Sequence, residues 1–199
     1  MLILNKENTD LIVKALIKDK VIAYPTDTVY GLASRFDSIQ AKQNLINKKN
    51  RPHEKSFPIM VSDIEMMKTI AIVTKEAEII IKEFMPGPLT VILKKQSHID
   101  DYVNDGKETL AIRLASDNYI KKIIEELGSP IFLTSANKSN LPVCTNEKEI
   151  EEYDLADLIV KGKPLNNIAS TIVDLSDNNI KVLREGPISL EDINKVLIK

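Results

Sequence analysis

Positive charge is concentrated in the segment at residues 47–56, NKKNRPHEKS. This segment contains one acid and several cations, in a chain whose net charge is −2. The cations are Lys48, Lys49, Arg51 and Lys55. Lys48 belongs to the solvated face of the preceding helical stretch, whereas Arg51 precedes a proline, which favours extended backbone in a loop leading to the apolar run FPIMV. Such a loop can form an anion pocket, and phosphate is its commonest ligand. A plain surface loop is the alternative interpretation.

The two familiar glycine-rich solutions to phosphate binding do not occur in this chain. The sequence contains neither G-x-x-x-x-G-K-[ST] nor G-x-G-x-x-G. If a nucleotide or another phosphate binds, side-chain cations must therefore neutralise its charge.

Polar residues also gather where apolar, strand-like runs end. PTDT follows KVIAY, TSAN follows PIFL, Arg113 closes TLAIR, Arg184 follows NIKVL, and Ser170 and Thr171 lie beside IVDL. In open α/β sheets, ligands collect at strand ends, where loops present polar groups without interrupting the sheet. Each residue alone is compatible with an ordinary turn, helix cap or surface ion pair. The constellation, rather than any one member, predicts a binding site.

The elements that must position these residues alternate between strand-like runs and amphipathic helices, which is typical of an α/β fold. Apolar residues spaced i, i+3, i+4, i+7 predict helices over 77–84 and 120–127. Ser116 or Asp117 can cap the second helix, which Gly128 follows, and the C-terminal SLEDINKVLIK opens with a capping-box pattern.

Strand candidates are too numerous and too irregularly spaced for a strict β-α-β order, so we expect a mixed sheet. The polar, turn-rich segment at 95–108 is expected to be a surface excursion. The candidate strands are KVIAY, FPIMV, LTVIL, TLAIRL, PIFLTS, DLIV, STIVDL and NIKVL.

Length and composition favour one globular domain over 1–199, although two small ones would also fit. Apolar residues make up 43% of the chain and charged residues 28%, which provides material for a core. Cys144 is the only cysteine, which excludes an intrachain disulfide and a multi-thiolate metal site. No stretch approaches the roughly 20 apolar residues of a membrane span, and the N-terminus is too quickly polar for a signal peptide. These features predict a cytoplasmic protein without membrane contact.

An ordered series of motifs spans nearly the whole chain and resembles the YrdC/TsaC-like family of threonylcarbamoyl-AMP synthases, in its short form without an extra C-terminal domain. The resemblance implies a twisted α/β sheet, mixed parallel and antiparallel, with flanking helices around a deep concave pocket. The motifs are YPTDTVYGL, KNRP, PGPLTVIL, IRL, TSAN, STIVD and LREG.

The resemblance also implies a nucleotidyltransferase activity. Its reaction joins L-threonine, bicarbonate and ATP into L-threonylcarbamoyl-adenylate and pyrophosphate, the first step of threonylcarbamoyladenosine formation in tRNA. Mg²⁺ is expected to arrive with ATP, and no fixed protein metal site is expected. A tRNA-modifying transferase would accept the product. With 27 basic against 29 acidic residues, the chain itself is expected to bind little tRNA.

Site residues follow from the resemblance position by position. The resemblance implies catalytic roles for Lys49, Arg51, Ser135 and Asn137. It implies an L-threonine site formed by Thr28, Arg113, the Leu133 backbone and Ser170. It implies an ATP site formed by Arg51, Lys55, Thr109, Ser135, Val143 and Arg184.

Two positions depart from the family pattern. Asn140 stands where many relatives have a glycine after SAN, so it must take any left-handed conformation needed there, which asparagine tolerates. This departure weakens the assignment of Val143. Met60 stands where relatives often have a histidine, which puts one substrate contact in question.

Three alternatives remain open at the level of sequence. A non-catalytic RNA-binding protein of the same fold is disfavoured by the net charge and the scarcity of aromatic residues. A carbamoyl-transfer module of a hydrogenase-maturation protein is disfavoured because the zinc-binding CxxC pairs of those proteins are missing. A related carbamoyl- or adenylyl-transfer enzyme acting on another small acid is the hardest to exclude.

Overall fold

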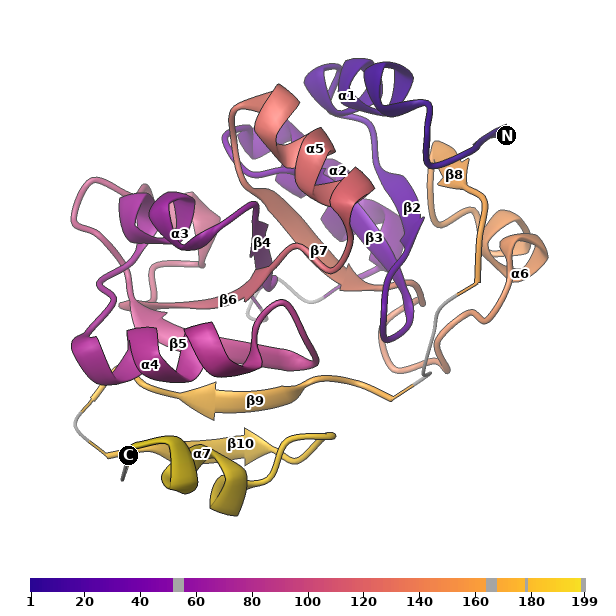
Figure 1. Cartoon of the computed structure of the whole chain (residues 1–199). Helices are drawn as coiled ribbons and strands as arrows, with labels where there is room; N and C mark the ends of the chain where they lie inside the picture. The colour runs from indigo at the N-terminus through magenta and orange to yellow at the C-terminus, as the bar shows by residue number, and fades with distance from the viewer. Residues whose placement is uncertain (52–55, 164–167, 178, 198–199) are drawn as a thin grey trace.

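One twisted sheet organises the chain in the computed structural model, which describes residues 1–51, 56–163, 168–177 and 179–197 (Figure 1). Within these ranges, its strand order is β1-β8-β2-β3-β7-β4-β6-β5-β9-β10. The strands are β1 (Leu2–Leu4), β2 (Ile22–Pro25), β3 (Tyr30–Arg35), β4 (Ile59–Val61), β5 (Leu89–Lys94), β6 (Thr109–Leu114), β7 (Ile131–Ser135), β8 (Leu158–Val160), β9 (Thr171–Asp174) and β10 (Lys181–Arg184).

The pairing of the strands is mixed, as predicted. β8 pairs in parallel with β1 and β2, as does β4 with β6 and β5 with β9. The pairs β2–β3, β3–β7, β4–β7, β5–β6 and β9–β10 are antiparallel. Every candidate strand named from the sequence is present. β1 and β3 were not predicted, and β3 changes the interpretation of 23–34, because the chain reverses after β2 and continues as a second strand.

Helices flank the sheet within the described part of the chain. The predicted helices over 77–84 and 120–127 are confirmed as α4 and α5. Asp117 caps α5 by accepting from the Ile120 N–H at 2.9 Å, and Gly128 follows it with φ +67°. The helices are α1 (Thr9–Ile17), α2 (Ile39–Lys49), α3 (Ile64–Ile70), α4 (Lys75–Phe84), α5 (Asn118–Leu127), α6 (Glu147–Glu152) and α7 (Leu190–Leu197), with a 3₁₀ turn η1 (Asp101–Val103).

Alternating side chains along the strands divide the core into two clusters. Ile22 and Tyr24 of β2 pack with the apolar faces of α1 and α5, which lie side by side. Val21 and Ala23 contribute to the other cluster, which contains Leu45 of α2 and apolar residues of α4 and α7. Figure 1 shows α5 and α2 on opposite sides of the sheet. No helix among the described residues is long and apolar enough to span a bilayer.

Candidate active site

A cavity of about 430 Å³ lies over the part of the sheet formed by β3, β7, β4, β6, β5 and β9. Residues paired in register point to the same face of a sheet, and this arrangement builds the cavity floor. Met60 pairs with Arg113, and Ala111 pairs with Ile92. All four border the cavity, so neighbouring strands together provide a floor in which Arg113 lies beside apolar side chains.

Many of the site residues predicted from the sequence lie together around this cavity. The predicted site residues that border the cavity are Thr28, Arg51, Arg113, Leu133, Ser135, Ser170 and Arg184. Those placed outside its border are Lys49, Thr109, Asn137 and Val143. Lys55 lies outside the described residues.

Thr26 holds the turn between β2 and β3. Its Oγ1 accepts hydrogen bonds from the N–H groups of Thr28 at 3.1 Å and Val29 at 3.2 Å, and it donates to the Val29 carbonyl at 2.7 Å. Thr28 Oγ1 lies 3.0 Å from Thr26 Oγ1, and both threonines border the cavity. The apolar strand therefore ends in hydroxyl residues because these close a tight turn at the cavity edge.

Arg113 is a fixed cation in the cavity floor. Its Nε and Nη2 donate to the Gly87 carbonyl at 3.1 and 2.8 Å, and its Nη1 donates to Thr28 Oγ1 at 3.3 Å. Nη2 also forms an ion pair with Asp27 Oδ2. Burial lowers the pKa of Arg113, and the Asp27 carboxylate opposes that shift. The guanidinium is thus held in one orientation from three directions.

Ser170 connects a second arginine to the floor. Arg184 Nε and Nη2 donate to the Ser170 carbonyl at 3.0 and 2.8 Å, and the Ser170 and Thr90 hydroxyl oxygens lie 2.8 Å apart. Gly186 allows this geometry, since a Cβ there would lie 2.5 Å from the Thr171 nitrogen. Burial lowers the pKa of Arg184. Unlike Arg113, Arg184 is bonded here to neutral groups.

Lys49 ends α2 and points into the protein. It is 2% exposed, and its Nζ donates to the Ser135 carbonyl at 2.6 Å, the Asn137 carbonyl at 3.0 Å and Asn137 Oδ1 at 2.8 Å. Ser135 Oγ donates to Asn137 Oδ1 at 2.7 Å, and Asn137 Nδ2 donates to the Leu141 carbonyl at 2.7 Å. Burial and the charge of Arg51 lower the pKa of Lys49 to about 7. This network fixes the loop that follows β7, and Ser135 is its member at the cavity.

Among the described residues of the basic loop, Arg51 is the cation that borders the cavity. Its Nη2 donates to the Ser56 carbonyl at 2.8 Å, and its guanidinium lies 4.6 Å from the centroid of the Phe57 ring. Burial lowers the pKa of Arg51, and the carboxylate of Asp105 opposes the shift. The arginine is therefore supported by the residues that lead into β4.

The segment at 95–108 is not only the surface excursion that its polarity predicted. Asn104 is buried, its carbonyl accepts from Ser56 Oγ at 2.9 Å, and its Nδ2 donates to the Thr109 carbonyl at 3.0 Å. Asp105 Oδ1 lies 2.6 Å from Nζ of the buried Lys42 of α2. The segment thus braces the chain that carries Arg51, and Thr109 contributes its carbonyl to that bracing.

The two departures from the family pattern have structural outcomes. Asn140 has φ +69°, so it adopts the left-handed conformation expected of a residue in place of glycine. Met60 is fully buried, packs in the cluster that contains Ile22 and Tyr24, and borders the cavity. Gly31 leaves room for the side chain of Leu133 on the neighbouring strand, because a Cβ at position 31 would lie 2.7 Å from Leu133 Cδ1.

Sequence reasoning counted Asp27 only as part of the PTDT stretch, without a role of its own, and gave Thr90 no role in the site. Asp27 stands in the PTDT stretch and was interpreted as a turn residue, but it pairs with Arg113 across 86 positions of sequence. Thr90 stands in a strand and reaches Ser170. A polar residue inside the apolar run LTVIL was the available signal for Thr90. The part of the chain that the structure describes holds no group of three or more His, Cys, Asp or Glu residues able to bind a metal ion.

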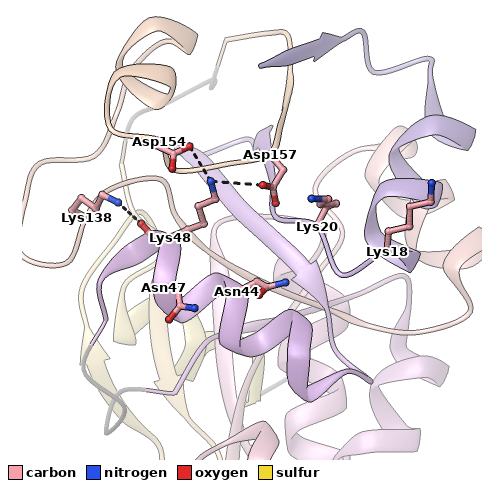
Figure 2. A pocket seen from close by; sticks show the side chains of 8 residues that line it. All are labelled: Lys18, Lys20, Asn44, Asn47, Lys48, Lys138, Asp154 and Asp157. Atoms are coloured by element: carbon pink, nitrogen blue, oxygen red, sulfur yellow. Dashed lines mark hydrogen bonds and ion pairs between the residues drawn. The ribbon is translucent and has the colours of Figure 1, made fainter.

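A second cavity, of about 370 Å³, lies beside α2 (Figure 2). Lys48 Nζ lies 2.9 Å from Asp154 Oδ1 and 3.6 Å from Asp157 Oδ1, and Lys138 Nζ donates to the Lys48 carbonyl at 2.8 Å. Lys48, which the sequence placed on a solvated helix face, is thus only 20% exposed and takes part in ion pairs. The bordering residues are Lys18, Lys20, Asn44, Asn47, Lys48, Lys138, Asp154 and Asp157.

Comparison with known proteins establishes the family of this α/β chain. The Sua5/YciO/YrdC family model, described as telomere recombination, matches residues 14–186. The chain belongs to this family.

Curated relatives and a solved structure extend the comparison. The threonylcarbamoyl-AMP synthase of Pyrococcus abyssi is 32% identical over 182 residues, which cover 89% of this chain and 54% of the relative. That of Aliivibrio fischeri is 33% identical over 186 residues, covering 90% of this chain and 100% of the relative. The crystal structure of P. abyssi Sua5 complexed with L-threonine superposes with a TM-score of 0.91 at 29% identity, covering 99% of this chain and 61% of that chain. This chain thus spans about half the length of the P. abyssi synthase and all of the A. fischeri one.

Proposed function

We propose that this chain synthesises L-threonylcarbamoyl-adenylate from L-threonine, bicarbonate and ATP, with release of pyrophosphate, as the first step of threonylcarbamoyladenosine formation in tRNA. One observation carries the proposal: a single cavity, in a chain of this family, combines the cations of Arg51, Arg113 and Arg184 with the hydroxyls of Thr28 and Ser170. The relatives named threonylcarbamoyl-AMP synthase, and the Sua5 complex with L-threonine, support it.

L-Threonine would bind at the end of the cavity floor formed by Arg113. The guanidinium would bind the substrate carboxylate, with Thr28, Ser170 and the Leu133 backbone completing the subsite. The support for this assignment is the orientation of Arg113, which the Gly87 carbonyl restrains on one side.

ATP would be bound by the arginines and hydroxyls that remain. Arg51, Ser135 and Arg184 border the cavity and would contact the nucleotide, with Lys55, Thr109 and Val143 as further candidates. Lys49 and Asn137 would act by holding the Ser135 loop in place. Mg²⁺ would enter with the triphosphate and supply charge neutralisation there.

The reaction requires no protein nucleophile. The threonine amine would form a nitrogen–carbon bond with carbon dioxide and release a proton to give a carbamate; with bicarbonate the same bond forms and water leaves. A carbamate oxygen then attacks the α-phosphorus of ATP. The bond between that phosphorus and the bridging oxygen breaks, and pyrophosphate leaves with its electron pair. The protein would hold two mutually repelling anions in contact and exclude water from a labile mixed anhydride.

We further propose that residues 1–199 form one domain that works in the cytoplasm and passes its product to a tRNA-modifying transferase. One sheet contains strands from both ends of the chain, which supports a single domain. Tight tRNA binding needs many phosphate contacts, and 27 basic against 29 acidic residues provide no surplus for them. Filter binding at physiological salt should therefore show weak binding, and submicromolar affinity competed by ATP would favour an RNA-binding function instead.

Pyrophosphate release tests the proposed reaction directly. The protein is incubated with ATP and Mg²⁺, with L-threonine and bicarbonate present together or singly, and the adenylate is identified by mass. We expect release only when both are present. Equal release when either one is omitted contradicts the proposal, and a panel of other amino acids and small acids identifies any different acceptor.

A further inference from the structure

Asp27 supplies the carboxylate that offsets the charge of Arg113 beside the cavity. Its side chain is 17% exposed and that of Arg113 is 8% exposed. Asp27 Oδ2 forms the ion pair, whereas Oδ1 is buried and accepts no hydrogen bond from the described part of the chain. The charge around this guanidinium is therefore close to neutral before any ligand binds. Arg184 differs, because its bonds go to the neutral oxygens of Ser170.

The hydrogens of Arg113 show where an anion can bind. A guanidinium has five N–H groups. Nε and Nη2 are used by the Gly87 carbonyl and Asp27, and one Nη1 hydrogen is directed to Thr28 Oγ1. The second Nη1 hydrogen has no acceptor among the described residues. An incoming carboxylate would accordingly meet Arg113 at Nη1.

The hydroxyl of Thr28 is a hydrogen-bond acceptor toward a ligand. The single hydroxyl proton of Thr26 is donated to the Val29 carbonyl, so Thr26 does not donate to Thr28 Oγ1, which lies 3.0 Å from its own oxygen. Thr28 Oγ1 then accepts from Arg113 and keeps one lone pair for a ligand. The subsite thus presents an N–H donor and an oxygen acceptor side by side, which matches a carboxylate adjacent to an ammonium group.

Resting on the proposed function, we propose that Asp27 is a specificity-determining residue: paired with Arg113, it makes this cavity select a zwitterionic amino acid over a carboxylic acid without an amino group. A simple carboxylate would bring a second negative charge to a guanidinium that Asp27 already offsets, and like charges that share one partner repel. A zwitterion brings its own ammonium group and adds no net charge. Arg51 and Arg184 attract any anion to the cavity, but Asp27 discriminates at Nη1.

Isothermal titration of the full chain with L-threonine and with 3-hydroxybutyrate tests this role. The second ligand keeps the carboxylate and the hydroxyl and lacks the amino group. The wild-type protein should bind L-threonine at least about tenfold more tightly, a ratio that corresponds to about 1.4 kcal/mol. Asp27→Asn retains the shape and an acceptor oxygen but removes the charge. It should reduce this preference at least about tenfold, with 3-hydroxybutyrate binding more tightly than to the wild-type protein.

Two matched variants separate charge from shape. Asp27→Glu keeps the charge and should keep the preference, and Asp10→Asn makes the same charge change on the exposed surface of α1 and should leave the ratio unaltered. Circular dichroism verifies that each variant is folded. If Asp27→Asn does not fold, the wild-type ratio still tests the proposal, because equal affinity for the two ligands would overturn it.

Each outcome has one meaning. Equal wild-type affinity for the two ligands, or an Asp27→Asn ratio equal to that of the wild type, overturns the role of Asp27 and leaves the synthase proposal standing. A wild-type protein that releases pyrophosphate without L-threonine and does not bind it refutes both proposals.

Discussion

The ammonium group of Lys49 should make the stability of this protein depend on pH in an unusual direction. Lys49 is buried at the end of α2, where its three hydrogens are directed to oxygens of Ser135 and Asn137. Burial, assisted by the charge of Arg51, lowers its pKa from 10.5 to about 7. We predict that the difference in unfolding free energy between the wild type and Lys49→Met changes between pH 6 and pH 9.

The sign follows from proton binding. Between about pH 7 and pH 10.5 the unfolded chain holds a proton on Lys49 that the folded chain has released, so the free energy of unfolding rises with pH in that window. Below the folded pKa the penalty for burying the charge is present in full. Each unit corresponds to about 1.4 kcal/mol, so from pH 6 to pH 9 the wild type should gain about 2.7 kcal/mol relative to Lys49→Met.

Urea unfolding of both proteins at pH 6, 7.5 and 9 measures this difference, because all other titrating groups are common to the pair. Lys121→Met, on the exposed face of α5, controls for the loss of one positive charge. A difference that stays constant within about 0.5 kcal/mol across this range would refute the reasoning, an error margin typical of such comparisons. It would mean that the three carbonyl acceptors keep the ammonium group protonated throughout.

Three further predictions concern the cavity and its frame. Arg51→Lys should impair pyrophosphate release nearly as much as Arg51→Ala, since a point charge does not replace a planar fork stacked on Phe57; near-normal rates would make Arg51 a steering charge. Arg113→Ala should raise the KM for L-threonine more than the KM for ATP, and an effect confined to ATP would reverse its assignment. Asp117→Ala removes the α5 cap together with bonds to Lys6 and Tyr24, and should lower the free energy of unfolding by about 3 kcal/mol in urea; a loss below about 1 kcal/mol would contradict this account.

Local patterns predicted most of the strands, and the two exceptions have physical causes. β1 has only three residues, and Leu2 and Ile3 are about half exposed, so it lacks a buried alternating face. β3 follows a polar turn and carries Gly31 and Ala33, which give little local preference for a strand. Its place in the middle of the sheet depends on pairing with β2 and β7, and β7 lies about a hundred residues further along.

The candidate site was predictable to the extent that its residues follow recognisable strands. Arg113 and Ser135 lie near the ends of predicted strands, and both border the cavity. Asp27 could not be assigned in the same way, because an aspartate after a proline is common in turns and its partner is fixed only by the sheet order. The bracing of Arg51 through Asn104 likewise depends on contacts distant in sequence.

Lys49 and Arg51 look like one cationic cluster in the sequence, but the fold gives them separate tasks. Asn50 caps α2 in the left-handed conformation, with φ +49°, and the backbone N–H groups of Asn50 and Arg51 both return to the last turn of the helix. This reversal leaves Lys49 facing inward, bonded to the loop after β7, and sends Arg51 to the cavity. Counting charges along the sequence therefore overstates the cations available to a phosphate. In the proposed reaction, Arg51, Arg184 and Mg²⁺ would neutralise the triphosphate together with any contribution from Lys55, while the hydrogen bonds of Lys49 Nζ hold Ser135 at the cavity.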